Sequence, residues 1–124
     1  MSHGRGPPPN ILIVEDEILV ALDEVSLVRS VGFQVAGPVA RVNEAFHILD
    51  TDRVDGALLD VNLNGKETSF PLADELERRG IPFLFVTGMG GDLVSRAFPG
   101  IPVLQKPFQP AILGAAIRRM IAKS

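Results

Sequence analysis

The sequence predicts an α/β domain in which five parallel strands form one sheet with helices on both of its faces. Two observations lead to this expectation. Short apolar runs alternate five times with segments of helical periodicity. The first and third of these runs are continuous in the way of strands buried on both faces. Because parallel strands need right-handed crossovers, the alternation predicts a doubly wound (βα)5 fold.

The expected strands are short. The run Ile-Leu-Ile-Val at 11–14 ends in acidic residues, and Gly-Ala-Leu-Leu at 56–59 also ends in an acid. Residues 33–36 form a weaker strand. The last two, at 81–86 and 101–104, have Pro near their start, where a missing backbone donor is tolerated.

The expected helices carry apolar residues at three- and four-residue spacing. The first begins at Ile18, has its apolar stripe through Ala21, Leu22, Val25 and Val28, and ends at a C-cap glycine, Gly32. Further helices are expected over 42–49, 72–79 and 111–120. Residues 90–98 begin with two glycines and precede Pro99, so we expect this fourth helix to be short or mobile.

Length and composition describe one folded domain. The chain has 124 residues, of which 46% are hydrophobic and 22% charged, close to the globular average. Residues 1–9, with three consecutive prolines, are expected to be a flexible lead, and residues 10–124 form the domain.

Composition also excludes several classes of function. The net charge is -3 with scattered basic residues, which argues against nucleic acid as a partner. The absence of cysteine excludes thiol chemistry and zinc–thiolate sites. No stretch has the length and apolarity of a secretory signal or a membrane span, so we expect a cytoplasmic protein with no membrane partner.

Polar side chains follow four of the expected strands, at the edge of the sheet where ligands bind. They are Glu15, Asp16 and Glu17 after the first, Asp60 after the third, Thr87 and Gly88 after the fourth, and Lys106 after the fifth. Clustered carboxylates need a cation, and their hard oxygen ligands suit Mg²⁺. A carboxylate beside Mg²⁺, a hydroxyl and an ammonium is equipped for phosphoryl transfer, with Asp60 as the nucleophile.

Each of these residues alone has a purely structural explanation. Asp60 can be a turn former, while Glu15 and Asp16 can stabilise the start of a helix through its dipole. Thr87 can simply end a strand, and Lys106 can be a solvated charge. Their joint placement at successive strand ends favours the phosphoryl-transfer hypothesis.

The same residues resemble the receiver domain of two-component response regulators, over roughly residues 10–122. The matching segments are Ile-Leu-Ile-Val-Glu15-Asp16-Glu, Leu-Leu-Asp60-Val-Asn-Leu, Val-Thr87-Gly and Leu-Gln-Lys106-Pro-Phe. The resemblance implies a flavodoxin-like receiver fold and a self-phosphorylating phosphoacceptor that dephosphorylates itself, rather than a turnover enzyme. The donor would be a phosphohistidine on a sensor histidine kinase or on a phosphotransfer protein.

The resemblance also implies a role for each site residue. Asp60 would accept the phosphoryl group. Asp16 and Asp60 would bind Mg²⁺ through their side chains, Glu15 would bind it through a water, and Asn62 would bind it through its backbone carbonyl. Thr87 would supply the switch hydroxyl, Lys106 would bind the phosphoryl group, and the peptide bond before Pro107 would be cis. Asn62 and Met89, two places after Asp60 and Thr87, would tune dephosphorylation.

More narrowly, the segments from Phe83 to Gly90 and from Asp60 to Gly65 resemble the stand-alone FATGUY receivers of alphaproteobacteria. That likeness implies a kinase of the HWE or HisKA2 type. The motif's Ala is replaced by Val86.

Two departures from the family pattern shape the expected output. The place of the usual aromatic switch holds Val103, so we expect the glycines that follow Thr87 to act as the switch instead; they are Gly88, Gly90 and Gly91. The chain ends at Ser124, so output is expected through contact with another protein or by draining phosphate from a kinase.

Three other readings remain open at this point. A pseudo-receiver would dock without phosphorylation, but such modules usually lose part of the acid and lysine set. A haloacid-dehalogenase-type phosphatase usually has a second Asp where this chain has Asn62. In a flavodoxin-like electron carrier the acids at 15–17 would repel the flavin phosphate, and this chain has no Trp or Tyr to stack on a flavin.

Overall fold

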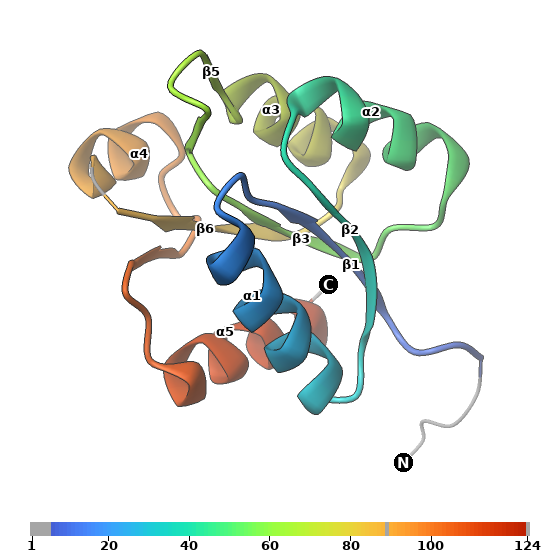
Figure 1. The fold of residues 1–124 in the computed structure, drawn as a ribbon. Coiled ribbons are helices and arrows are strands. Elements are labelled where there is room, and N and C mark those ends of the chain that lie inside the picture. Colours follow the sequence, from blue (N-terminus) through green and yellow to red (C-terminus); the bar gives the residue numbers. More distant parts are fainter. Residues whose placement is uncertain (1–5, 89, 124) are drawn as a thin grey trace.

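The computed structural model describes residues 6–88 and 90–123, which form three layers with a parallel sheet in the middle (Figure 1). The strands of this sheet are β1 (Asn10–Val14), β2 (Gln34–Val39), β3 (Gly56–Leu59), β6 (Phe83–Thr87) and β7 (Val103–Gln105). Their spatial order is β2-β1-β3-β6-β7, and every neighbouring pair is parallel. The order changes direction between β1 and β3, which confirms the doubly wound prediction.

Helices cover both faces of the sheet. They are α1 (Ile18–Ser30), α2 (Val42–Thr51), α3 (Phe70–Arg79), α4 (Gly91–Ala97) and α5 (Pro110–Ala122). In Figure 1, α1 and α5 lie on one side of the sheet and α2, α3 and α4 on the other. With seven residues, α4 is a short helix, as expected.

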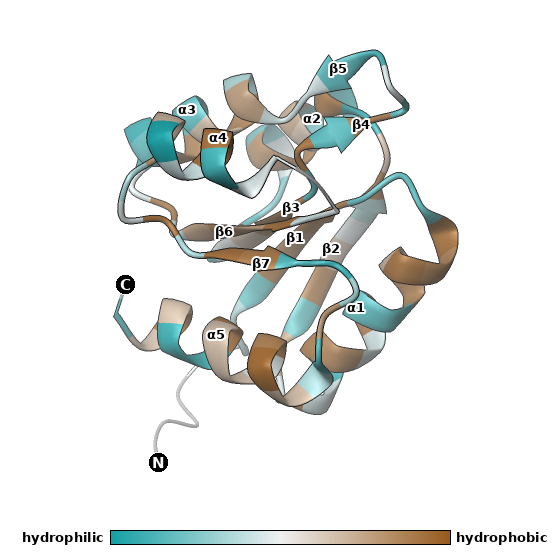
Figure 2. Cartoon of the chain, turned by 90° about the vertical axis from the view of Figure 1, so that its left-hand side faces the viewer, coloured by the Kyte–Doolittle hydropathy of each residue, from teal (hydrophilic) through white to brown (hydrophobic). Residues whose placement is uncertain are grey.

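The side chains of one strand supply both layers of the core, because successive residues point to opposite faces. Leu12 and Val14 pack with the α2–α4 layer, whereas Ile11 and Ile13 pack with α1 and α5. All four are buried, which explains why β1 reads as a continuous apolar run. Figure 2 shows hydrophobic segments of the central strands lying between the two layers of helices.

The strand β2 extends further than expected and contains a bulge. Its pairing with β1 runs from Leu12 opposite Ala36 to Val14 opposite Val39, so one extra residue is inserted. Gly37 lies in this bulge with φ 90°, and a Cβ there would come within 2.9 Å of the Val39 nitrogen. Only glycine fits this position without displacing backbone.

A two-stranded hairpin follows β3 and is absent from the expected elements. It consists of β4 (Asn62–Leu63) and β5 (Glu67–Thr68), paired antiparallel. Asn64 and Gly65 form the turn with φ of 57° and 65°, and the Lys66 amide donates to the Leu63 carbonyl at 3.1 Å. This geometry is typical of the Asn-Gly hairpin turn.

The last residues before β1 contact the domain. The Pro9 carbonyl accepts a hydrogen bond from the Gln34 amide at 2.8 Å, and the Pro8 carbonyl accepts one from Arg53 at 2.7 Å. Residues 1–5 of the expected lead lie outside the described residues. In the described part of the chain, no helix is long and apolar enough to cross a membrane.

Candidate functional site

The ends of the central strands bring the expected site residues to one edge of the sheet. Glu15 follows β1 and Asp60 follows β3, while Thr87 is the last residue of β6 and Lys106 follows β7. Backbone hydrogen bonds fix the positions of two of them. The Asp60 amide donates to the Val14 carbonyl at 2.9 Å, and the Lys106 amide donates to the Thr87 carbonyl at 2.8 Å.

The ammonium of Lys106 lies at the centre of this site. Its Nζ is 2.8 Å from Oε1 of Glu15, 2.9 Å from Oε1 of Glu17 and 3.3 Å from Oδ2 of Asp60. The side chains of Glu15 and Asp60 are almost fully buried, whereas that of Glu17 is largely exposed. One cation is therefore shared by three carboxylates.

Glu15, Asp16 and Asp60 form a cluster that fits a divalent cation. One carboxylate oxygen from each lies within 4.8 Å of the others. The acids of this cluster outnumber the single ammonium of Lys106 and leave excess negative charge in a partly buried space, and their oxygens are the ligands that Mg²⁺ prefers. The donor set therefore fits Mg²⁺, and Asn62 lies two residues after Asp60 at the start of β4.

Burial and charge shift the acid–base properties of this cluster. Burial, followed by the negative charge of Glu15, raises the pKa of Asp60 to about 7, against the opposing effect of Lys106. Burial alone would lower the pKa of Lys106, but hydrogen bonds to Glu15 and Glu17 outweigh it and raise that pKa above its usual value. The lysine thus stays protonated, and the aspartate gains from any further cation nearby.

Comparison with solved structures places this geometry in a family. The solution structure of SdrG from Sphingomonas melonis Fr1 is 38% identical, with a TM-score of 0.81 over 94% of this chain and 99% of that one. The PhyR response regulator REC domain of Erythrobacter litoralis has a TM-score of 0.82 at 23% identity, over 94% of this chain and 92% of that one. The chain belongs to the response-regulator receiver domains. No family model matches it.

Curated relatives agree with this assignment. The phyllosphere-induced regulator PhyR of Methylorubrum extorquens is 32% identical over 118 residues, which cover 90% of this chain and 43% of PhyR. The transcriptional regulatory protein PdtaR of Mycobacterium tuberculosis is 26% identical over 119 residues, which cover 94% of this chain and 58% of PdtaR. This receiver spans about half the length of the curated relatives that it matches.

The segment that the sequence predicts to act as the switch lies between β6 and α4. Thr87 is buried at the end of β6 and lines a cavity of about 440 Å³. Gly90, Gly91 and Val103 also line this cavity. Val103 stands where the family pattern has an aromatic ring, so the side chain that faces the cavity from this position is smaller here. Gly90 has φ of 78°, and Met89 lies outside the described residues. The peptide bond between Lys106 and Pro107 is cis.

Two acids near the site carry no role in the sequence analysis. Glu17 contacts Lys106, as described above. Glu24 is 2% exposed on the sheet-facing side of α1, between Ala21 and Val28. Burial, then the charge of Glu15, raises the pKa of Glu24 to about 8. Its spacing of three from Ala21 and four from Val28 was a signal that Glu24 lies on the buried face.

The face that α1 buries differs from the expected one. The buried residues are Ala21, Glu24 and Val28, while Ile18 is 76% exposed and Leu22 is 57% exposed. The expected apolar stripe therefore mixes two faces of the helix. The prediction that Ile18 and Leu22 belong to the buried stripe was wrong. The apolar residues of α1 occupy both a core face and a solvent face, and periodicity alone does not separate the two.

Proposed function

We propose that this receiver accepts one phosphoryl group on Asp60 in a Mg²⁺-dependent reaction, from a phosphohistidine on a sensor histidine kinase or a phosphotransfer protein. The observation that carries the proposal is the contact of Lys106 with both Asp60 and Glu15, inside an acidic cluster that fits Mg²⁺. A pseudo-receiver is disfavoured because the nucleophile, the acids and the lysine are all present and mutually in reach.

The transfer forms one bond and breaks one. A carboxylate oxygen of Asp60 attacks the phosphorus, and the O–P bond forms as the P–N bond to the donor imidazole breaks. The electron pair of the broken bond remains on the imidazole nitrogen. Lys106, already 3.3 Å from Oδ2 of Asp60, contacts the negatively charged phosphoryl oxygens, and the Thr87 hydroxyl turns toward the same group.

The metal would be held by Asp16 and Asp60 through their side chains, by Glu15 through a water and by the Asn62 carbonyl. When bound, Mg²⁺ supplies positive charge that neutralises the phosphoryl oxygens during transfer. The positive charge of Mg²⁺ is needed because the carboxylates of the site outnumber the single ammonium of Lys106. Asp16 is the ligand most separable from the nucleophile, and Asp16→Asn should weaken Mg²⁺ binding without removing Asp60.

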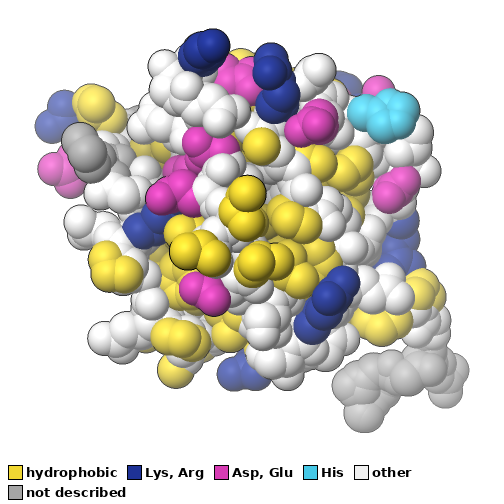
Figure 3. Space-filling model, in the orientation of Figure 1, with side chains coloured by type: hydrophobic (Ala, Val, Ile, Leu, Met, Phe, Trp, Pro, Cys, Tyr) yellow, Lys and Arg dark blue, Asp and Glu magenta, His cyan; other side chains and the backbone are white. Residues whose placement is uncertain are grey.

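The phosphodonor docks on α1. Ile18, Leu19 and Leu22 are exposed to 76%, 77% and 57%, which is unusual for three large apolar side chains on one helix. Figure 3 shows hydrophobic side chains gathered over α1, with acidic side chains beside them. Because α1 begins at Ile18, directly after the acids of the site, a donor seated there brings its phosphohistidine close to Asp60.

The phosphorylated state is read through the surface of α4, β7 and α5. Leu93 on α4 and Ile112 on α5 are exposed apolar side chains on these elements. When Thr87 meets the phosphoryl group, the glycines at 88, 90 and 91 allow the segment leading into α4 to rearrange. This surface would contact a downstream protein, and without such a partner the receiver would act as a phosphate sink. In this function the receiver works in the cytoplasm, together with its kinase.

The test is phosphorylation measured by intact mass. The protein is incubated with phosphoramidate, whose P–N bond resembles that of the donor, with and without Mg²⁺. We expect the wild type and the exposed-surface control Asp74→Asn to gain the mass of one phosphoryl group only with Mg²⁺. Asp60→Asn should gain none. A wild-type rate of mass gain in Asp60→Asn would overturn the assignment of the nucleophile.

A further inference from the structure

The β4–β5 hairpin makes two contacts that the proposed function does not use. At its turn, the Asn64 amide donates to Oδ2 of Asp16 at 2.8 Å. On its second strand, Oε2 of Glu67 accepts a hydrogen bond from the Val42 amide at 3.2 Å. Val42 is the first residue of α2, so the hairpin joins the acidic cluster to the start of that helix.

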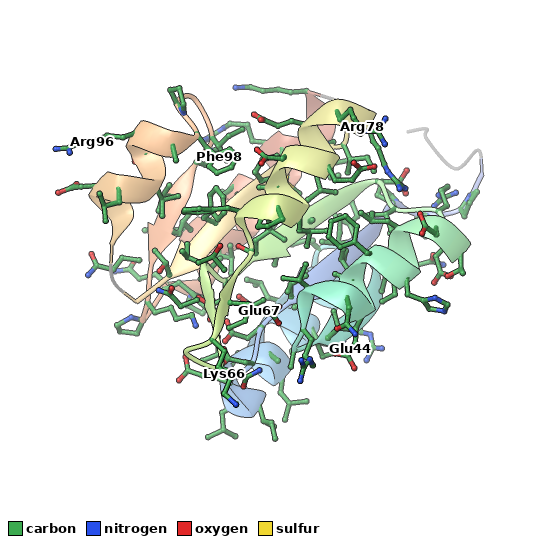
Figure 4. The ribbon with its side chains drawn as sticks, turned by 90° about the horizontal axis from the view of Figure 1, so that it is seen from above. Glu44, Lys66, Glu67, Arg78, Arg96 and Phe98 are labelled. Carbon is green, nitrogen blue, oxygen red and sulfur yellow. The ribbon has the colours of Figure 1, made fainter. Side chains whose placement is uncertain are left out.

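The contact with α2 replaces a cap that the helix lacks. The N-cap residue of α2 is Arg41, whose side chain makes no capping hydrogen bond. The first amides of a helix need acceptors, and a negative charge near them is favourable. Glu67 supplies both from a distant part of the chain. Figure 4 shows Glu67 between the hairpin and α2, with Lys66 farther out at the turn.

The hairpin is suited to transmit a constraint because it is anchored. Leu63 is fully buried in the core, and the Ser69 amide donates to the Val61 carbonyl at 2.9 Å where the hairpin joins α3. The turn itself is fixed by the Lys66–Leu63 hydrogen bond and by the positive φ of Asn64. A rigid two-residue turn places the Asn64 amide at one point relative to Asp16.

We infer that Glu67 is a positioning residue: by holding the hairpin against α2, it keeps the Asn64 amide on Asp16 and so orients that carboxylate for the metal. The inference rests on the proposed function, because it assigns Asp16 as a metal ligand. The Asn64 amide uses one lone pair of Oδ2 and fixes the plane of the Asp16 carboxylate, whose remaining lone pairs stay available to the cation. Metal binding and the start of α2 are then coupled in both directions.

The first measurement is hydrogen exchange of backbone amides in the metal-free protein. Glu67→Ala removes the acceptor and should speed the exchange of the Val42 amide about fivefold, with a smaller acceleration at Asn64. Glu67→Gln keeps a carbonyl acceptor and should remain close to wild type. Glu77→Ala, which removes an exposed acid from α3, is the matched control and should change neither amide.

The second measurement is Mg²⁺ affinity, followed by calorimetry and by the backbone amide shifts of Asp16 and Asn64. We expect Glu67→Ala to bind Mg²⁺ about threefold to tenfold more weakly, and saturating Mg²⁺ to slow Val42 exchange in the wild type but not in this variant. Equal Mg²⁺ affinities would overturn the inference even if Val42 exchange accelerates, because Glu67 would then only cap the helix. Unchanged Val42 exchange would overturn it as well.

These outcomes are separate from those that test phosphorylation. Neither exchange nor Mg²⁺ affinity requires Asp60 to accept a phosphoryl group. If Asp60 fails to gain mass while Glu67→Ala weakens Mg²⁺ binding, the proposed function fails and the positioning role stands. If Asp60 gains the phosphoryl mass while Glu67→Ala binds Mg²⁺ as tightly as the wild type, only the positioning role of Glu67 fails.

Discussion

The ring of Phe98, at the end of α4, packs against the ring of Phe85 in β6 with centroids 5.4 Å apart. Phe98 also contacts Phe70 and Phe83, and only 6% of its surface is exposed. The short helix α4 is thus tied to the sheet by an aromatic cluster at the end that carries Phe98, which Figure 4 labels beside α4. The other end of α4 follows the glycines after Thr87.

Removal of this aromatic anchor should release α4. We expect Phe98→Ala to lower the free energy of unfolding by about 3–5 kcal/mol, as for other buried rings, and to remove the amide protection of residues 91–97 first. Leu93→Ala on the exposed face of α4 is the control and should cost little. Chemical denaturation and amide exchange provide the measurements. Full retention of α4 protection in Phe98→Ala would show that other contacts hold the helix.

The glycine segment should respond to the phosphorylated state. With Mg²⁺ and beryllofluoride as a phosphoryl mimic, we expect amide exchange to change across residues 90–98, because Thr87 moves and the glycines before α4 permit rearrangement. The aromatic cluster should keep Phe98 fixed, so that the change decreases toward the end of α4. Changes confined to the residues around Asp60 would contradict a switch in this segment.

Asp60 should titrate near neutrality when no metal is present. Burial and Glu15 raise its pKa to about 7, so the carboxyl carbon signal should show a midpoint there instead of near 3.8. Mg²⁺ binds only the carboxylate form and should lower the midpoint. Lys106→Ala should raise it, because the ammonium favours the charged form. A midpoint near 3.8 in the metal-free protein, or one that Mg²⁺ leaves unchanged, is incompatible with this cluster.

The buried Glu24 should make stability depend on pH. The folded protein holds its proton up to about pH 8, whereas the unfolded chain loses it near 4.5, so stability falls as pH rises through this window. Glu24→Gln should abolish this pH-dependent decrease in the free energy of unfolding, which is on the order of 5 kcal/mol at most. Urea unfolding at pH 5 and pH 8.5, with Glu77→Gln as the exposed control, measures the effect. Equal pH slopes in Glu24→Gln and wild type would show that Glu24 ionises without cost.

The lifetime of the phosphoryl group should depend on Asn62. Its carboxamide, exposed at the start of β4, can hold a water for attack on the acyl phosphate, so Asn62→Ala should slow the decay. Met89 lies outside the described residues; the sequence predicts that its side chain shields the acyl phosphate, so we expect Met89→Ala to accelerate the decay. The decay is followed by intact mass after removal of the donor, with Asn43→Ala on the exposed side of α2 as control. If neither variant alters the decay, hydrolysis is controlled elsewhere.

Sequence periodicity was sufficient for the order of strands and helices. Continuous apolar runs such as 11–14 and 56–59 are buried on both faces, so they stand out from the helical segments between them. The boundaries were less accurate for the last two strands. They begin at Phe83 and Val103 instead of 81 and 101, because Pro82 and Pro102 have no N–H to donate to a neighbouring strand.

The site was predictable where residues follow strands and not where they come from other elements. Asp60 and Lys106 are placed by the ladder hydrogen bonds that precede them, so strand order alone brings them together. The hairpin was missed although Asn64-Gly65 is a turn signal, because its strands have only two residues each. The role of Glu67 depends on a contact 25 residues away in sequence, which no local pattern encodes.

The bulge in β2 protects this receiver from association through its sheet. β2 forms one outer edge, and its Gly37-Pro38 interruption breaks the regular spacing of donors and acceptors that another strand would need. Pro38 has no N–H to offer, and the opposite edge, β7, is only three residues long. In the described part of the chain, the main sheet therefore has no long, regular strand edge on which the sheet of another copy could continue.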